Sequence, residues 1–146
     1  MSFAVDLKKL RSNPVRDKRV LLIDDHVDTL VPLNLLMKHL GISANLVFDG
    51  FTAKRSLERR IYDLIVIDWN MPQMNGAECL AYADAAIARA GTAGQKLPFV
   101  VYSALGAEAI KLPELKHFEY VGHWKKPLTL SQLTRRVTAL LMRLEK

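Results

Sequence analysis

Short apolar runs, separated by stretches long enough for a helix, dominate the hydrophobic pattern of the chain. The runs are Val20–Ile23, Leu64–Ile67, Phe99–Tyr102 and Tyr120–Val121. They consist mainly of β-branched, aliphatic and aromatic residues, as is typical of strands buried on both faces of a parallel sheet. The pattern therefore predicts a parallel sheet whose strands alternate with helices.

The remaining elements follow from amphipathic stretches and from capping residues. The predicted second strand is Ala44–Phe48, and the fifth strand extends over Glu119–His123. The first helix of the domain has Leu33, Leu36, Met37 and Leu40 on its inner face and Gly41 as carboxyl cap. The other predicted helices are Phe51–Ile61 with Ala53, Leu57 and Ile61 inward, about Gly76–Ala90, Gly106–Lys111 cut off by Pro113, and a last helix opened by the capping box Thr129-x-x-Gln132.

Pro32 lies near the beginning of the first of these helices. Its missing amide costs little if Asp28 caps the helix, and otherwise Pro32 kinks it.

This alternation predicts an α/β fold with a doubly wound sheet of five parallel strands and five helices. Crossovers between parallel strands are right-handed, and a flavodoxin-like order 2-1-3-4-5 would place the ends of strands one and three side by side. An extra amphipathic helix over residues 2–11 precedes the sheet. We expect a basic amino-terminal arm at residues 1–18 and one domain at residues 19–146.

The net charge of +6 is unevenly distributed. Residues 1–19 contain six basic and two acidic side chains and so carry +4, which leaves +2 for the rest of the chain. One interpretation is a solvated, solubilising surface, and the other is contact with an acidic protein, a lipid headgroup or nucleic acid. Aromatic residues are not interleaved with the basic ones, which argues against nucleic acid.

Several classes of protein are disfavoured by the sequence. No apolar stretch is long enough to span a bilayer, and the first residues lack the order of a secretory signal. A single cysteine, Cys79, permits no internal disulfide, so a cytoplasmic location is expected. Cys79 itself is interpreted as a core residue of a helix.

Five polar residues near the ends of the strands carry the candidate chemistry. Parallel strands end at one edge of the sheet, so Asp24, Asp25, Asp68, Ser103 and Lys126 should converge there. Clustered carboxylates repel one another, and Mg²⁺ relieves this because it prefers oxygen ligands. An aspartate can also accept a phosphoryl group as an acyl phosphate, with a hydroxyl and an ammonium stabilising the transferred charge.

His26 follows the acidic pair directly. No second histidine is spaced to join it as a metal ligand, so it is interpreted as an exposed loop residue near the site.

The chain resembles a response-regulator receiver domain of two-component signalling over roughly residues 19–146. The segments that carry the resemblance are Leu22-Ile23-Asp24-Asp25-His26, Asp68-Trp69-Asn70-Met71-Pro72-Gln73-Met74-Asn75-Gly76, Ser103-Ala104 and Lys126-Pro127. Either the acidic pair or the lysine–proline pair alone would be a weak signal. All four segments in order, at this spacing, are a strong one.

The resemblance implies a role for each acidic position. Asp68 would be the phosphoacceptor, taking a phosphoryl group from the phosphohistidine of a histidine kinase or phosphotransfer protein. Asp25, Asp68 and the backbone carbonyl of Asn70 would bind Mg²⁺ directly, and Asp24 would assist through water.

The resemblance also implies the roles of the carboxyl-terminal half of the site. Ser103 would hydrogen-bond the phosphoryl oxygens and move inward, while Lys126 would pair with the phosphoryl charge. The bond between Lys126 and Pro127 would be cis. The family usually has an aromatic residue three positions before the lysine that rotates on phosphorylation. Here that switch position is His123, whose charge can change near neutral pH.

The leading hypothesis is a single-domain receiver, not an enzyme acting on external substrates, that passes its signal to a downstream protein by contact. The short helix ended by Pro113, together with His123, predicts an unusual partner surface where receivers commonly dock or form homodimers. The main alternative is a pseudo-receiver adaptor whose binding ignores phosphorylation.

Two further alternatives come from other functional classes. An aspartyl phosphatase usually carries a second aspartate two residues after the first, where this chain has Asn70. The basic arm could instead bind nucleic acid or a membrane surface.

Overall fold

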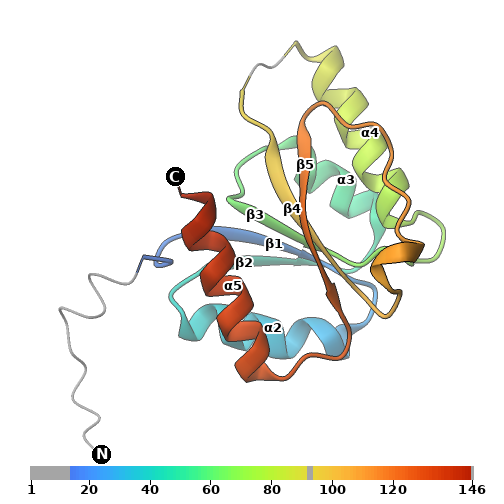
Figure 1. Ribbon diagram of the computed structural model, residues 1–146. Helices are drawn as coiled ribbons and strands as arrows, with labels where there is room; N and C mark the ends of the chain where they lie inside the picture. Colours follow the sequence, from blue (N-terminus) through green and yellow to red (C-terminus); the bar gives the residue numbers. More distant parts are fainter. Residues whose placement is uncertain (1–13, 92–93, 146) are drawn as a thin grey trace, which may run out of the picture.

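The computed structural model describes residues 14–91 and 94–145, so the predicted helix at 2–11 lies outside the described residues. Within them, five strands alternate with four α-helices and one turn of 3₁₀ helix (Figure 1). The strands are β1 (Arg19–Ile23), β2 (Ser43–Val47), β3 (Leu64–Ile67), β4 (Leu97–Ser103) and β5 (Phe118–Lys125). The helices are α2 (Val27–His39), α3 (Gly50–Glu58), α4 (Gly76–Arg89), η1 (Ala107–Ala109) and α5 (Leu130–Leu144).

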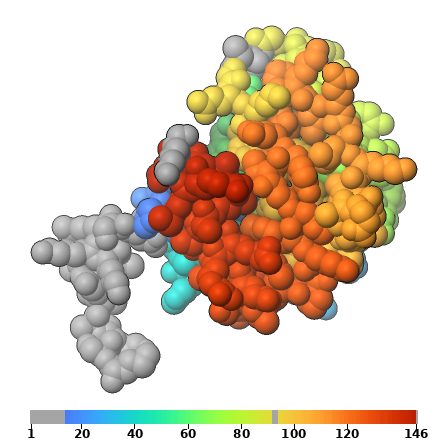
Figure 2. All heavy atoms as spheres, viewed as in Figure 1, coloured from blue at the N-terminus to red at the C-terminus, as the bar shows by residue number. Residues whose placement is uncertain are grey.

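All neighbouring strands are parallel, and their order is β2-β1-β3-β4-β5. The predicted flavodoxin-like topology is therefore confirmed. Helices α2 and α5 cover one face of the sheet, and α3 and α4 cover the other (Figure 1). Figure 2 shows that the chain from η1 to α5, coloured orange to red, forms much of one side of the molecule.

Successive side chains of the central strands point to opposite faces of the sheet and so contribute to both layers of the core. Val20 and Leu22 pack with α2 and α5, whereas Leu21 and Ile23 pack with α3 and α4. All four are at most 1% exposed. The runs have no polar positions because both faces of this sheet are covered.

The single cysteine lies in the second of these layers, as predicted. Cys79 is buried on α4, and its thiol donates to the carbonyl of Gly50 at 3.3 Å. Desolvation is the main reason that the pKa of this thiol is raised, to about 12, so Cys79 stays protonated at neutral pH.

The prediction of a second helix reaching Ile61 was wrong. Asp49 caps the helix by accepting the backbone N–H of Thr52 at 2.8 Å, but α3 ends at Glu58. Arg60 has a positive φ of 55°, which α-helical backbone does not adopt. Ile61 consequently lies past the helix and is 36% exposed rather than facing inward.

The short helix predicted around Gly106–Lys111 is present but shorter than expected. Only the single turn η1 forms, and no helix or strand is assigned between Ile110 and His117. The buried carboxylate of Asp84 on α4 holds the end of this segment, because it accepts the N–H groups of Lys116 at 3.1 Å and His117 at 2.7 Å. The Asp84 side chain therefore supplies hydrogen-bond acceptors to a part of the chain that has no assigned helix or strand.

Asp28 does not cap α2. Of the two possibilities considered for Pro32, a helix capped by Asp28 is therefore wrong. The residue at the cap position is His26, whose side chain makes no capping hydrogen bond. The helix nevertheless continues through Pro32 to His39. Its buried residues Leu30, Leu33, Leu36 and Met37 pack against the sheet and stabilise it despite the missing amide.

Asp84 gives a test of how the segment before β5 is held. We expect Asp84→Ala to lower the free energy of unfolding by about 1–3 kcal/mol, because the backbone N–H groups of Lys116 and His117 lose their acceptor. Urea denaturation monitored by circular dichroism measures this. The matched control is the exposed Glu114→Ala, expected to change stability by less than about 0.5 kcal/mol. Equal effects of the two substitutions would contradict the assigned role.

Candidate functional site

The acidic residues meet because β1 and β3 end side by side. Ile23 is paired with Ile67 in the sheet, and the Asp68 N–H donates to the Ile23 carbonyl at 2.9 Å. Asp24 continues β1 on the other side, donating its N–H to Val47 at 3.0 Å. The backbone of both aspartates is therefore fixed by neighbouring strands. Asp24 and Asp68 are 2% and 5% exposed.

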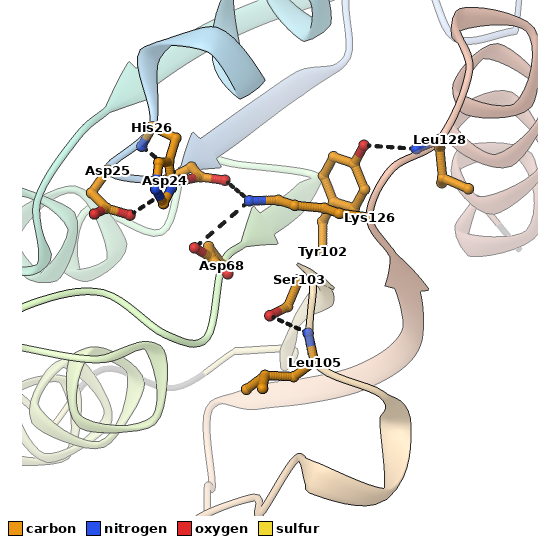
Figure 3. Close-up of polar contacts among 9 residues, drawn as sticks. All are labelled: Asp24, Asp25, His26, Asp68, Tyr102, Ser103, Leu105, Lys126 and Leu128. Carbon is orange, nitrogen blue, oxygen red and sulfur yellow. Dashed lines mark hydrogen bonds and ion pairs between the residues drawn. The ribbon is translucent and has the colours of Figure 1, made fainter.

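Lys126 connects the two buried carboxylates (Figure 3). Its Nζ lies 2.5 Å from Asp24 Oδ2 and 3.7 Å from Asp68 Oδ2. The ammonium also lies 5.5 Å from the centre of the Tyr102 ring, within the range of a cation–π contact. One cation thus serves two carboxylates, and its shorter contact is to Asp24.

The ends of β4 and β5 position Ser103 and Lys126 together. The N–H of Lys126 donates to the carbonyl of Ser103 at 2.8 Å, and the peptide bond to Pro127 is cis. Ser103 is 1% exposed, and its hydroxyl accepts the N–H of Leu105 at 3.2 Å. The hydroxyl oxygen is therefore held by the loop that follows β4.

The loop after β3 folds back tightly against Asp68. A Cβ on Gly76 would lie 2.7 Å from the Asp68 carbonyl oxygen and 2.8 Å from the Trp69 ring, so only glycine fits. The N–H of Gly76 also donates to the Trp69 carbonyl at 2.9 Å. This close approach gives a physical reason for the glycine at the end of the Asp68–Gly76 segment.

The pKa of Asp68 is raised above its ordinary value. Desolvation by burial is the largest cause, and the negative charge of Asp24 adds to it. The Lys126 ammonium, the Ser103 hydroxyl and the backbone N–H of Asn70 oppose the shift, because each favours the ionised carboxylate. Burial and carboxylate repulsion outweigh these three contributions.

The residues of this cluster fit a divalent cation. Asp24, Asp25 and Asp68 carry three negative charges against the one positive charge of Lys126, which leaves −2. Asp25 Oδ1 is buried and accepts no hydrogen bond from the described residues. Carboxylate oxygens are the ligands that Mg²⁺ prefers, and a buried oxygen without a donor is open to such an ion.

Two sets of contacts at the site were not predicted from the sequence, those of His26 and those of Tyr102. His26 is exposed, as expected, yet its Nδ1 lies 3.2 Å from Asp24 Oδ1 and 3.2 Å from Asp25 Oδ1. The Tyr102 hydroxyl accepts the N–H of Leu128 at 3.3 Å and so ties β4 to the chain that follows Lys126. From the sequence, Tyr102 is interpreted only as a buried strand residue. Its contact with Lys126 becomes apparent only in the folded structure.

Comparison with known proteins places these features in a family. The family model described as response regulator receiver domain matches residues 20–138. The chain is 33% identical over 128 residues to transcriptional regulatory protein TctD of Salmonella typhimurium, covering 86% of this chain but only 52% of TctD. It is 27% identical over 130 residues to chemotaxis protein CheY-3 of Vibrio cholerae, covering 88% of this chain and 95% of CheY-3.

Solved structures share the fold. The receiver domain of sensor histidine kinase PA1611 from Pseudomonas aeruginosa PAO1, crystallised with a magnesium ion coordinated in its active site cleft, superposes with a TM-score of 0.67. It is 22% identical, and the match covers 86% of this chain and 98% of that one. A CheY-like receiver domain from Methanospirillum hungatei JF-1 gives a TM-score of 0.66 at 18% identity, with 88% and 97% covered.

The raised pKa of Asp68 predicts how the site affects stability. A carboxyl whose folded pKa is raised stabilises the fold at pH values below its unfolded pKa, and this contribution is lost as the pH rises through the folded pKa. At neutral pH the ionised Asp68 is therefore unfavourable. We expect Asp68→Asn to raise the thermal midpoint at pH 7.

The gain in the midpoint should shrink as the pH falls through the raised pKa, because the wild-type carboxyl then also becomes neutral. Thermal unfolding of both proteins across this range measures the difference. The exposed Asp28→Asn is the control. A lower midpoint for Asp68→Asn at pH 7 would refute the electrostatic assignment.

Proposed function

Because the chain belongs to the response regulator receiver family, we propose that Asp68 accepts a phosphoryl group in a two-component phosphorelay. The donor in this proposal is the phosphohistidine of a histidine kinase or of a phosphotransfer protein, and the signal passes to a downstream protein by contact. Receiver domains are signalling modules rather than enzymes with external substrates. The observation that supports the proposal best is the buried Asp68 carboxylate within reach of Lys126 Nζ.

In the proposed reaction, a carboxylate oxygen of Asp68 forms a bond to phosphorus. The phosphorus–nitrogen bond of the phosphohistidine breaks, and the leaving imidazole keeps the electron pair and takes a proton from water. The Lys126 ammonium and the Ser103 hydroxyl stabilise the charge on the phosphoryl oxygens. Lys126 would then exchange part of its contact with Asp24 for one with the phosphoryl group.

We propose Mg²⁺ as the cofactor of this step. Asp25, Asp68 and the backbone carbonyl of Asn70 would hold the ion, with Asp24 assisting through water. When bound, Mg²⁺ supplies the positive charge that the cluster lacks and neutralises the incoming phosphate. Asp24 is already paired with Lys126 at 2.5 Å, which suits it to a less direct role in holding the ion.

A chain of contacts links the phosphorylation site to β5. The N–H of Leu105 donates to Ser103 Oγ at 3.2 Å, and His123 Nε2 donates to the Leu105 carbonyl at 2.8 Å. A shift of Ser103 toward a phosphoryl group would pull on Leu105 and thereby disturb the contact of His123. We propose His123 as the switch residue of this receiver.

The alternative function, an adaptor whose binding is independent of phosphorylation, is favoured by one observation. The chain from Ile110 to His117 contains no assigned helix and is fixed to α4 by Asp84. A segment held in this way could present one surface in both states. On this alternative the phosphorylation site would bind a phosphoryl group without any effect on the partner surface.

Phosphoryl acceptance has a direct test. We expect the protein, incubated with Mg²⁺ and acetyl phosphate, to gain one phosphoryl group by intact-mass spectrometry, and Asp68→Asn to gain none. Lys126→Ala should slow labelling by about a hundredfold, because a donor to the developing charge is lost. Asp28→Asn, an exposed acid on α2, should label like the wild type. Undiminished labelling of Asp68→Asn would refute the proposal.

Hydrogen exchange can test the switch and decide between receiver and adaptor. We expect the phosphoryl mimic beryllium fluoride to change exchange of the amides at residues 104–110 in the wild type. In His123→Leu, which cannot donate to the Leu105 carbonyl, these amides should exchange faster even without the mimic. His123→Gln keeps a donor and is the matched control.

Binding of beryllium fluoride with no change at residues 104–110 would favour the adaptor. A His123→Leu pattern identical to the wild type would refute the switch role of His123.

A further inference from the structure

His26 is an exposed residue that lies close to the carboxylates of the proposed metal site. Its Nδ1 lies 3.2 Å from both Asp24 Oδ1 and Asp25 Oδ1, as Figure 3 shows for these side chains. Potential ligand atoms of Asp24, Asp25, His26 and Asp68 all lie within 4.8 Å of one another. In an octahedral site with bonds of about 2.1 Å, adjacent ligands are about 3.0 Å apart and opposite ligands about 4.2 Å apart. The observed spacing is close to that of ligands sharing one ion.

The two carboxylate oxygens that face His26 differ in their other contacts. Lys126 pairs with Oδ2 of Asp24, whereas Oδ1 lies on the side of His26 and hydrogen-bonds to its backbone N–H and to Nδ1. Asp25 Oδ1 is buried and accepts no hydrogen bond from the described residues. A single Nδ1–H could donate well to only one of these two oxygens, whereas a cation between them would satisfy both carboxylates and the ring nitrogen.

The His26 side chain is available for this role. It occupies the cap position of α2 but makes no capping hydrogen bond. The side chain is 66% exposed, so turning the ring toward an ion displaces no packed neighbours and costs little burial. Its backbone is meanwhile anchored, because its N–H donates to Asp24 Oδ1 at 2.9 Å.

We propose that His26 Nδ1 is a ligand in this metal site and makes the site favour first-row transition ions such as Co²⁺, Ni²⁺ and Zn²⁺. Imidazole nitrogen binds these ions well, whereas Mg²⁺ prefers oxygen and gains little from it. The inference shares its carboxylates with the proposed phosphoryl acceptor but concerns only which ion they bind. It can therefore fail while phosphoryl acceptance holds, and the reverse is also true.

Ion selectivity is the decisive measurement. Isothermal titration calorimetry of the full chain with Co²⁺ and with Mg²⁺, in one buffer at one pH, gives both dissociation constants. We expect His26→Ala to weaken Co²⁺ binding about tenfold or more, and Mg²⁺ binding by less than about threefold. His39→Ala, which removes an exposed histidine at the other end of α2, is the matched control and should change neither. Equal effects of His26→Ala on both ions, or no effect, would overturn the proposal.

A spectroscopic measurement identifies the atom. On addition of Zn²⁺, the ¹⁵N resonance of His26 Nδ1 should shift, while the other histidines remain unchanged at one equivalent. Binding of Zn²⁺ without a shift at His26 Nδ1 would also overturn the proposal. The loss of labelling by acetyl phosphate and Mg²⁺ in Asp68→Asn tests the proposed function separately.

Discussion

The repulsion among three carboxylates at adjoining strand ends is the constraint on which the site depends. Burial and Asp24 raise the pKa of Asp68, and the single ammonium of Lys126 lies closer to Asp24 than to Asp68. The cluster therefore retains excess negative charge, which a divalent cation held by the carboxylate oxygens would reduce.

The sheet makes this unfavourable cluster possible because it fixes the backbone on every side. Asp68 donates its N–H to β1, Asp24 donates to β2, and Lys126 donates to Ser103 at the end of β4. Gly76 lets the following loop lie directly on Asp68. The hydrophobic layers on both faces of the sheet provide the stability that offsets the electrostatic cost.

The segment between β4 and β5 connects the site to the surface. It contains only one turn of 3₁₀ helix, is fixed at its end by Asp84, and contacts His123 through the Leu105 carbonyl. Its beginning is hydrogen-bonded to the Ser103 hydroxyl through the Leu105 N–H, whereas its end is held by α4. Any signal that leaves the site through this route is therefore expected to be confined to the residues around Leu105 and His123.

The sequence by itself determined the approximate strands and the strand-end positions of Asp24, Asp25, Asp68, Ser103 and Lys126, because buried parallel strands and the residues that follow them are local features of the pattern. The strand order was predicted from the alternation of strands and helices, by assuming a flavodoxin-like topology. Helix ends were less predictable: α3 stops before Ile61, and the expected helix at Gly106–Lys111 shrinks to η1. Only the tertiary structure decided that Lys126 pairs with Asp24, that Asp84 holds the chain before β5, and that His26 faces the acidic pair. Lys126 and Asp24 are 102 positions apart in the chain, and Asp84 and His117 are 33 positions apart. The orientation of His26 depends on how α2 leaves the sheet. Such contacts are set by packing in three dimensions rather than by neighbours in the chain.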